Sequence, residues 1–259
     1  ELHRTLNIVR LAVNQKLREE RIVAIMEDAR QIQNSILPRH LPKPGDFEIA
    51  ARSVAAEFVG GDFYDVIVLD NEIFDVVIAD AAGHGLPAAL QVSDVFTGLR
   101  MAQSREFKLY RTVQRLNEII HRSRLATKFV SLVLMEIDLK GTVIYCNAGH
   151  PRPILMRTDG SVERLDQGGP ILGPVPNASY SIGVQCMGPG DLIVLFTDGV
   201  NEASADDDEE YGHERLIHAV RTLLHRDPPD IVYRIYTYVA KFSPNSPPDD
   251  DQTLVVIKR

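Results

Sequence analysis

Apolar residues recur at helical spacing through the first part of the chain, which contains neither Gly nor Pro before Pro38. The pattern predicts one long helix, or two stacked helices, from Leu2 to about Ile36. Two apolar seams within it have coiled-coil spacing and are out of phase with each other. Their members are Leu2, Leu6, Val9 and Val13, and then Ile22, Ile25, Ala29, Ile32 and Ile36. The charged stretch 17–21 between the seams is a candidate hinge, since a slip in heptad phase alters the supercoil.

A cluster of Pro38, Pro42, Pro44 and Gly45 marks the end of this helix, because proline cannot continue the helical hydrogen-bond ladder. We therefore predict a helical linker over residues 1–40 and a globular domain over residues 41–259. Residues 1–36 are expected to form a parallel homodimeric coiled coil. A helix packed along its own domain is the alternative interpretation.

Strand-like apolar segments alternate with turn residues through the rest of the chain. They begin near residues 47, 62, 72, 129, 142, 191 and 253. Short connections at Asn71 and at Lys140 and Gly141 predict antiparallel hairpins. Helices are predicted from Pro87 to about Ser104, from Leu109 to about Arg124, from Glu214 to Leu224 and from Asp230 to about Phe242. This order is typical of an α+β fold in layers with mainly antiparallel sheets.

The composition is that of an ordinary globular protein, with 44% hydrophobic and 25% charged residues. A net charge of −8 argues against a nucleic-acid partner, because binding a phosphate backbone needs clustered Lys and Arg. The apolar runs are too short for a membrane span. Cys146 and Cys186 are interpreted as buried, reduced thiols of a cytoplasmic protein. Because the chain begins at Glu1, we interpret its first residues as the interior of a longer protein, with an upstream segment missing.

Four aspartates stand where apolar strands begin or end, namely Asp62, Asp80, Asp198 and Asp250. The start of one antiparallel strand lies beside the end of the next, so all four are expected to converge on one sheet edge. Such a carboxylate cluster needs cations, because like charges repel strongly in a partly desolvated site. Oxygen ligands without a Cys or His cluster favour Mg²⁺ or Mn²⁺. Two such ions would make phosphate-ester hydrolysis plausible by activating a bridging water.

Five segments occur in the order of a known motif set. They are EFVGGDFYD at 57–65, IADAAGHGLPAAL at 78–90, YCNAGHPRPIL at 145–155, FTDGVNEA at 196–203 and DDQTLVVIK at 250–258. Together they resemble the metal-dependent, protein phosphatase 2C-like (PPM) family in its bacterial SpoIIE/RsbU-type branch, over roughly residues 27–259. The resemblance implies a layered α-β-β-α sandwich and a serine/threonine phosphatase with two Mn²⁺ or Mg²⁺ ions.

The resemblance also assigns roles to individual residues. Asp80 would bridge the two metals together with the backbone carbonyl of Ala81. Asp62 would serve the second metal, while Asp198 and Asp250 would complete the first. Asp249, Asp250 and Asp251 are consecutive, so the ligand is uncertain by one position. Asp250 is chosen because it fits the family pattern of an acid, then an acid or Asn, any residue, and then Ser or Thr.

Three basic residues near the motifs are given no catalytic role. His84 lies two residues beyond the position where many eukaryotic relatives carry a proposed proton donor, and a solvated turn residue is the favoured interpretation. His150 is interpreted as a structural residue beneath the site. Arg152 is the nearest candidate for a phosphate contact, with a surface arginine as the favoured alternative.

Members of this branch generally dephosphorylate a small anti-anti-sigma (STAS) protein and are preceded by sensor domains. The resemblance therefore implies a phosphorylated STAS protein as the substrate in partner switching, with regulation through the N-terminal helix. Two other functions stay open. One is a non-catalytic module that uses the fold to bind a partner, and the other is hydrolysis of a small phosphomonoester by the same metals.

Overall fold

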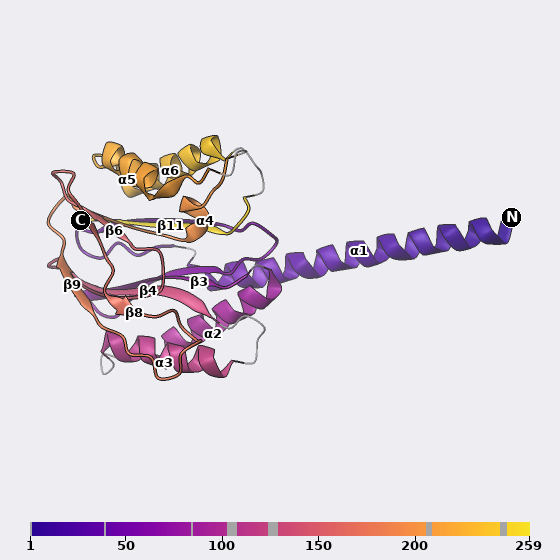
Figure 1. The fold of residues 1–259 in the computed structure, drawn as a ribbon, viewed down its shortest axis with the longest axis horizontal. Coiled ribbons are helices and arrows are strands. Elements are labelled where there is room, and N and C mark those ends of the chain that lie inside the picture. Colours follow the sequence, from indigo (N-terminus) through magenta and orange to yellow (C-terminus); the bar gives the residue numbers. More distant parts are fainter. Residues whose placement is uncertain are drawn as a thin grey trace.

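The computed structural model describes residues 2–38, 40–83, 85–102, 108–123, 129–205, 209–243 and 248–259. Two sheets face each other in the middle of the molecule, and helices cover their outer sides (Figure 1). Helices α5 (Gly212–Leu223) and α6 (Pro228–Phe242) cover one sheet. Helices α2 (Leu86–Ala102) and α3 (Leu109–Arg122) cover the other. The predicted α-β-β-α sandwich is confirmed.

The sheet beneath α5 and α6 has the strand order β1-β11-β10-β6-β7, and its pairs are antiparallel. Its strands are β1 (Glu48–Val54), β11 (Gln252–Lys258), β10 (Leu192–Phe196), β6 (Ile154–Met156) and β7 (Val162–Arg164). The C-terminal strand β11 therefore lies between β1 and β10. This position brings the residues just before Gln252 beside those just after Phe196.

The second sheet has the order β2-β3-β4-β5-β8, and β9 pairs with the first half of β5. Its strands are β2 (Asp62–Val68), β3 (Ile73–Ala81), β4 (Val130–Asp138), β5 (Thr142–Ala148), β8 (Gly168–Gly169) and β9 (Gly183–Cys186). The β2–β3 and β4–β5 hairpins are those predicted at Asn71 and at Lys140 and Gly141. Only the short β5–β8 contact is parallel among the described pairs.

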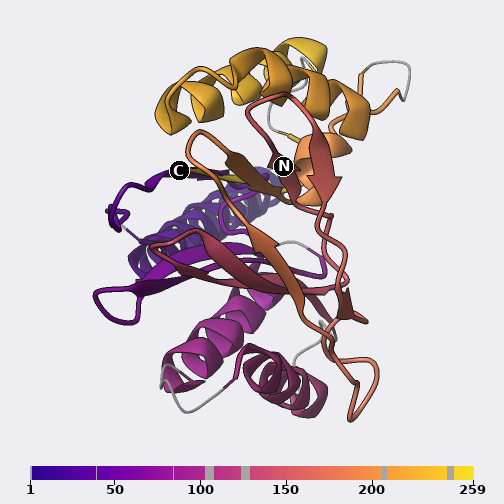
Figure 2. The same ribbon diagram turned by 90° about the vertical axis from the view of Figure 1, so that its left-hand side faces the viewer.

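Three apolar clusters hold the layers together, as the alternation of strand residues requires. One lies between the sheets and includes Phe47, Phe74 and Met135. The others join each sheet to its helices, around Phe63 on one side and Phe196 on the other. Each fully buried large side chain of this kind stabilises the fold by about 1.5–3 kcal/mol. Figure 2 shows the same layers from the side.

Helix α1 (Leu2–Ile36) is one continuous helix, as the absence of Gly and Pro predicts. Its C-terminal end contacts the domain, where Ile36 and Leu37 pack against apolar clusters, and the rest projects away from the layers (Figure 1). In the predicted second seam, Ile22, Ile25 and Ile32 are 57%, 53% and 66% exposed. The side chains of the first seam lie outside the described residues. Coiled-coil dimerisation stays a prediction.

Several details differ from the sequence-based expectation. The strands β6 to β9 were not predicted, because they span only two to four residues and carry little alternation. Cys146 is buried as expected, whereas Cys186 is exposed on β9 and its predicted burial is wrong. Helix α6 begins at Pro228, which suits a first turn, with the Asp227 side chain accepting a hydrogen bond from the Asp230 amide at 3.0 Å.

The predicted helix ends at Ser104 and Arg124 lie outside the described residues. None of the helices in the described ranges combines the length and the apolar character that a membrane crossing requires.

Candidate functional site

Asp62 and Asp80 are direct partners in the β2–β3 register, at the end of the sheet where β2 begins and β3 ends. Asp62 is only 4% exposed. The loop before β2 is tied to the end of β3, because the Ala81 amide donates to the Gly61 carbonyl at 3.0 Å. Two adjacent strand ends thus hold two carboxylates and the Ala81 backbone in one place.

Asp198 and Asp250 come from the other sheet. Asp198 begins the short helix α4 (Asp198–Asn201) after β10, and Asp250 lies just before β11. The expectation that all four acids share one sheet edge is therefore wrong: each sheet contributes two, at the same end of the sandwich. Thr197 connects the two pairs, since its Oγ1 donates to Asp62 Oδ2 at 2.8 Å and accepts from the Thr253 amide at 2.9 Å.

The electrostatics connect Asp80 with acids of the other sheet. Burial, and then the charges of Asp198 and Asp250, raise the pKa of Asp80 to about 8. Burial, followed by the charge of Asp80, raises the pKa of Asp62 well above its usual value. Burial and Asp250 likewise raise the pKa of Asp198. These shifts have the direction expected for carboxylates crowded together without a cation.

The structure separates the three consecutive acids at the start of β11. Asp249 is exposed and accepts a hydrogen bond from Ser204 Oγ at 3.1 Å. Asp251 is buried, and its carboxylate accepts from the Ala56 amide at 2.8 Å and from the Gly61 amide at 2.5 Å. Asp250 lies between them and is exposed, and its Oδ1 accepts only from the neighbouring Asp251 amide among the described contacts. Its carboxylate is thus the one of the three that stays available beside Asp80 and Asp198.

Two glycines before Asp62 allow this close packing. A Cβ on Gly61 would stand 2.6 Å from the Ala81 carbonyl oxygen. A Cβ on Gly60 would stand 2.5 Å from Asp251 Oδ2. No side chain fits at such distances, so the two glycines are required for the approach of Asp251 and Ala81 to the Asp62 loop.

The chemistry of these residues fits a divalent metal. All the side-chain donors are carboxylate oxygens, which suit Mg²⁺ and Mn²⁺, and Asp62 Oδ1 is buried without a hydrogen-bond partner. Such an oxygen is costly unless a ligand satisfies it. As the side chains are placed, no three Asp, Glu, His or Cys residues of the described ranges form a complete metal-binding group. The four carboxylates lie at the same end of the sandwich, but their side chains would have to move for three of them to bind one ion.

Other residues that the sequence singled out have different positions. His84 lies outside the described residues. His150 is buried, and its Nδ1 lies 2.6 Å from Ser131 Oγ, which agrees with a position beneath the site. Arg152 is exposed in a neighbouring cavity. Sequence reasoning missed Thr197, although its position directly before Asp198 in the FTDG motif was a usable signal.

It also missed Gln33, which lies on α1 far from any motif. The Gln33 side chain pairs with the backbone of Gly60 in both directions. Its Oε1 accepts from the Gly60 amide at 3.0 Å, and its Nε2 donates to the Gly60 carbonyl at 2.5 Å. A cavity of about 480 Å³ lies beside this contact and is lined by Gln33, Asp62 and Asp251 among others. The end of α1 is therefore attached to the loop that leads to Asp62.

Comparison with known protein families decides the relationship. The family model described as stage II sporulation protein E (SpoIIE) matches residues 71–259. The chain belongs to the SpoIIE family. The match includes three of the four acids and leaves Asp62 outside, within the segment that resembles the family by its own motif.

Two curated proteins illustrate what this SpoIIE-family chain is similar to. Protein IcfG of Synechocystis sp. is 30% identical over 220 residues, which cover 74% of this chain and 35% of IcfG. Phosphoserine phosphatase RsbU of Bacillus subtilis is 27% identical over 245 residues, which cover 93% of this chain and 72% of RsbU. The chain thus spans about a third of IcfG and most of RsbU.

A solved structure supports the fold of the SpoIIE-family chain. The SiaA-PP2C domain of Pseudomonas aeruginosa superimposes with a TM-score of 0.79 at 21% identity, covering 93% of this chain and 98% of that domain. Because the sequence identity is low, this structural similarity establishes the fold alone. The chain has the architecture of a PP2C-type phosphatase domain.

Proposed function

We propose that this chain is a metal-dependent protein-serine/threonine phosphatase. The observation that carries the proposal is the convergence of four aspartates from two sheets on one end of the sandwich, with Asp62 Oδ1 buried and unpaired. Asp62, Asp80, Asp198, Asp250 and the Ala81 carbonyl would hold two Mn²⁺ or Mg²⁺ ions. Membership of the SpoIIE family and the similarity to a protein named as a phosphoserine phosphatase support this activity.

When bound, the two ions would supply an activated water and neutralise charge on the phosphoryl oxygens. The chain's own residues determine where this happens. Thr197 holds one oxygen of Asp62 and leaves the other free. Asp251 fixes the Gly61 amide, and thereby the loop that precedes Asp62. These contacts orient the ligands from outside the coordination shell, as partners of metal ligands generally do.

The substrate in this proposal is a phosphoserine or phosphothreonine on a STAS protein of a partner-switching system. The SpoIIE/RsbU-type motifs of the chain favour this class of substrate. The proposal also divides the chain into a linker over residues 1–40 and a phosphatase domain over residues 41–259.

Regulation is proposed to act through α1. Residues 1–36 would form a homodimeric coiled coil, whose crossing angle or register would respond to a sensor upstream. The bidentate contact of Gln33 with Gly60 supports a route from this helix to the Asp62 loop. Mn²⁺ affinity and turnover measured with and without residues 1–36 test this route, and identical values would contradict it.

The activity is tested by phosphate release from a phosphorylated STAS protein with Mn²⁺, with Mg²⁺ and with a chelator. We expect turnover with either metal and none with the chelator. Asp80→Asn should lower turnover by about 100-fold or more, since it removes the carboxylate that would hold both ions. Asp166→Asn, on an exposed loop residue, is the matched control and should retain full turnover. Metal-independent release, or a fully active Asp80→Asn protein, would exclude the mechanism.

A further inference from the structure

A second cavity, of about 250 Å³, opens where the segment after β5, the end of β7 and the start of α5 meet. Its polar lining comes from three separate segments of the chain: His150 and Arg152 follow β5, Arg164 ends β7, and His213 lies in the first turn of α5. Ile154 and Ile217 supply an apolar wall. We call this cavity the basic pocket.

The pocket carries an excess of positive charge. Arg152 has no hydrogen-bond or ion-pair partner among the described residues. Arg164 pairs with Glu214 at 2.8 Å, but the two side chains are 43% and 85% exposed, so solvent screens the pair. Burial, the charge of Arg164 and a smaller effect of Arg152 lower the pKa of His213, whereas Glu214 and Glu210 raise it. The charges of both arginines therefore act on the His213 ring.

His150 adds a buried group that lacks a partner. Its Nδ1 is hydrogen-bonded to Ser131 Oγ, whereas Nε2 is buried and makes no hydrogen bond with the part of the chain that the structure describes. The Phe196 carbonyl lies near the ring and favours its charged form, yet burial dominates and lowers the pKa to about 3. The ring is therefore neutral. When Ser131 donates to Nδ1, Nε2 carries the proton and needs an acceptor.

The pocket is close to the proposed reaction centre. Ser131, which holds His150, is the β4 register partner of Asp80. The His213 ring packs edge-on against Phe196 at 5.6 Å between centroids, and Phe196 is two residues before Asp198. A protein that presents a phosphorylated residue to the four aspartates would therefore bring its neighbouring residues near the pocket.

We propose that the basic pocket binds an anionic group, and that it receives a carboxylate or a second phosphoryl group of the phosphorylated partner protein. The binding of an anion is independent of the proposed function, whereas the role in substrate choice rests on it. Anionic oxygens are the class of ligand that matches two guanidinium groups and an imidazole N–H donor.

Binding is tested on the full chain in chelator, by following the ring signals of His150 and His213 in NMR spectra during titration with inorganic phosphate at constant ionic strength. We expect saturable shifts and a rise in the pKa of His213, because an anion stabilises the imidazolium. Arg152→Gln and Arg164→Gln should each weaken binding by about tenfold. Arg111→Gln is the matched control, since Arg111 is an exposed arginine on α3 that contacts Tyr110. Shifts that do not saturate, or that persist unchanged in both pocket variants, would overturn the proposal.

The role in substrate choice needs a second measurement, kcat/KM with Mn²⁺ on two phosphoserine peptides. One peptide carries Glu on both sides of the phosphoserine and the other carries Gln. We expect the wild type to prefer the acidic peptide by about tenfold and Arg152→Gln to lose the preference. Saturable phosphate binding without a peptide preference would identify the occupant as the product phosphate and overturn the substrate role. If neither peptide is hydrolysed, the proposed function fails while the anion site stands on the NMR result.

Discussion

Thr197 donates a hydrogen bond from Oγ1 to Asp62 Oδ2 at 2.8 Å, and this contact joins the two sheets at the acidic end of the sandwich. Thr197 is completely buried, and its Oγ1 also accepts from the Thr253 amide. The hydroxyl therefore sets the orientation of an aspartate whose other oxygen is free. Loss of this contact should therefore lower metal affinity more than it lowers the stability of the fold.

We expect Thr197→Val to lower Mn²⁺ affinity by about 10- to 100-fold, the range typical of partners that orient metal ligands. Isothermal titration calorimetry measures the effect. Thr222→Val, which removes a hydroxyl bonded to the Ala219 carbonyl on α5, is the control and should leave affinity unchanged. Equal affinities in wild type and Thr197→Val would show that Asp62 does not depend on Thr197.

Gln33→Ala should reduce Mn²⁺ affinity without shortening α1. The substitution removes both hydrogen bonds to Gly60, and two such bonds correspond to about tenfold in affinity. Gln31→Ala, on an exposed position of the same helix, serves as the control. Far-UV circular dichroism checks that helicity is retained. If calorimetry finds the two variants alike, α1 does not act on the site through Gln33.

Asp75 should make stability depend on pH. It stands opposite Glu136 in the β3–β4 register, and burial followed by the charge of Glu136 raises its pKa to about 7. A raised acid pKa means that the folded state keeps a proton that the unfolded state releases. Stability from this group is therefore lost as pH rises from about 4 to about 7.

Asp75→Asn abolishes that dependence, and we expect it to raise the free energy of unfolding by roughly 1–2 kcal/mol at pH ~8 and hardly at all at pH ~4. Urea denaturation at the two pH values measures the difference. Asp166→Asn provides the exposed control. A gain of the same size at both pH values would assign the effect to something other than the proton.

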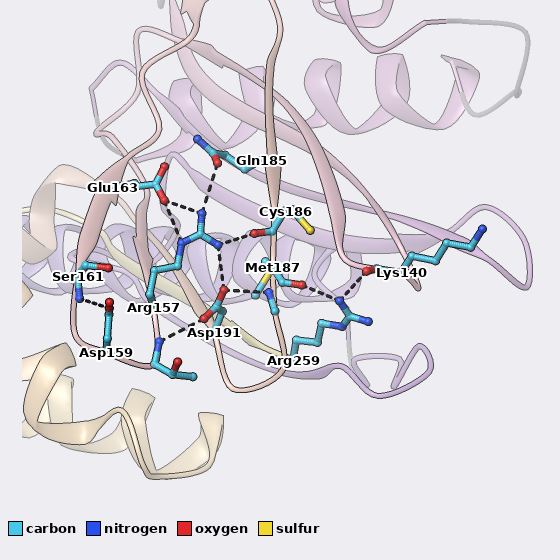
Figure 3. A network of polar contacts seen from close by, with 12 residues as sticks. Lys140, Arg157, Asp159, Ser161, Glu163, Gln185, Cys186, Met187, Asp191 and Arg259 are labelled. Atoms are coloured by element: carbon cyan, nitrogen blue, oxygen red, sulfur yellow. Dashed lines mark hydrogen bonds and ion pairs between the residues drawn. The ribbon is translucent and has the colours of Figure 1, made fainter.

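Arg157 joins the two sheets through the polar network of Figure 3. Asp191 in this network precedes β10, whereas Asp198 follows it, so the network lies at the end remote from the aspartates. The Arg157 guanidinium contacts Glu163 at 2.5 Å, Asp191 at 2.9 Å and the Cys186 carbonyl. Asp191 is 7% exposed on its side chain, so removing the arginine leaves a nearly buried charge unpaired. The network thus stabilises the connection of β6 and β10 to β9.

We expect Arg157→Ala to lower the free energy of unfolding by about 2 kcal/mol, after allowing for partial exposure of the arginine. Phosphatase turnover at low temperature should be unchanged, because Asp191 and Asp198 lie at opposite ends of β10. Arg215→Ala breaks an ion pair in which both side chains are about half exposed, and it should cost far less. Thermal denaturation of the two variants distinguishes these expectations.

The long strands, the helices and the layered fold follow from sequence patterns, because alternation and turn residues act locally. The pairing of strands into two sheets does not, and for this reason the four aspartates were expected on one edge. Asp198 and Asp250 reach Asp80 across the gap between sheets, a contact that only the packing of the sandwich creates. The sequence nevertheless predicted that each of these aspartates lies at the end of a strand.

The hydrogen-bond partners of Thr197, Gln33 and Asp251 could not be predicted for a similar reason, although the position of Thr197 before Asp198 was a signal for that residue itself. Thr197 and Gln33 act through hydrogen bonds to groups 135 and 27 residues away in sequence. Asp251 has the same side chain as Asp250, and only burial against the Ala56 and Gly61 amides separates the two. The sequence motifs identify the metal-binding candidates, whereas the hydrogen bonds that position those residues can be identified only in the folded structure.

The three aspartates before β11 also limit how this part of the gene can change. Each has a different environment, and strand pairing fixes the register from Gln252 onwards. Deleting one codon at this point would move Asp249 into the place of Asp250, so aspartates would still occupy the places of Asp250 and Asp251. Inserting one between Asp250 and Asp251 would pull Asp250 away from its neighbours. Point substitutions should therefore be tolerated at Asp249, whereas an insertion between Asp250 and Asp251 should be rejected.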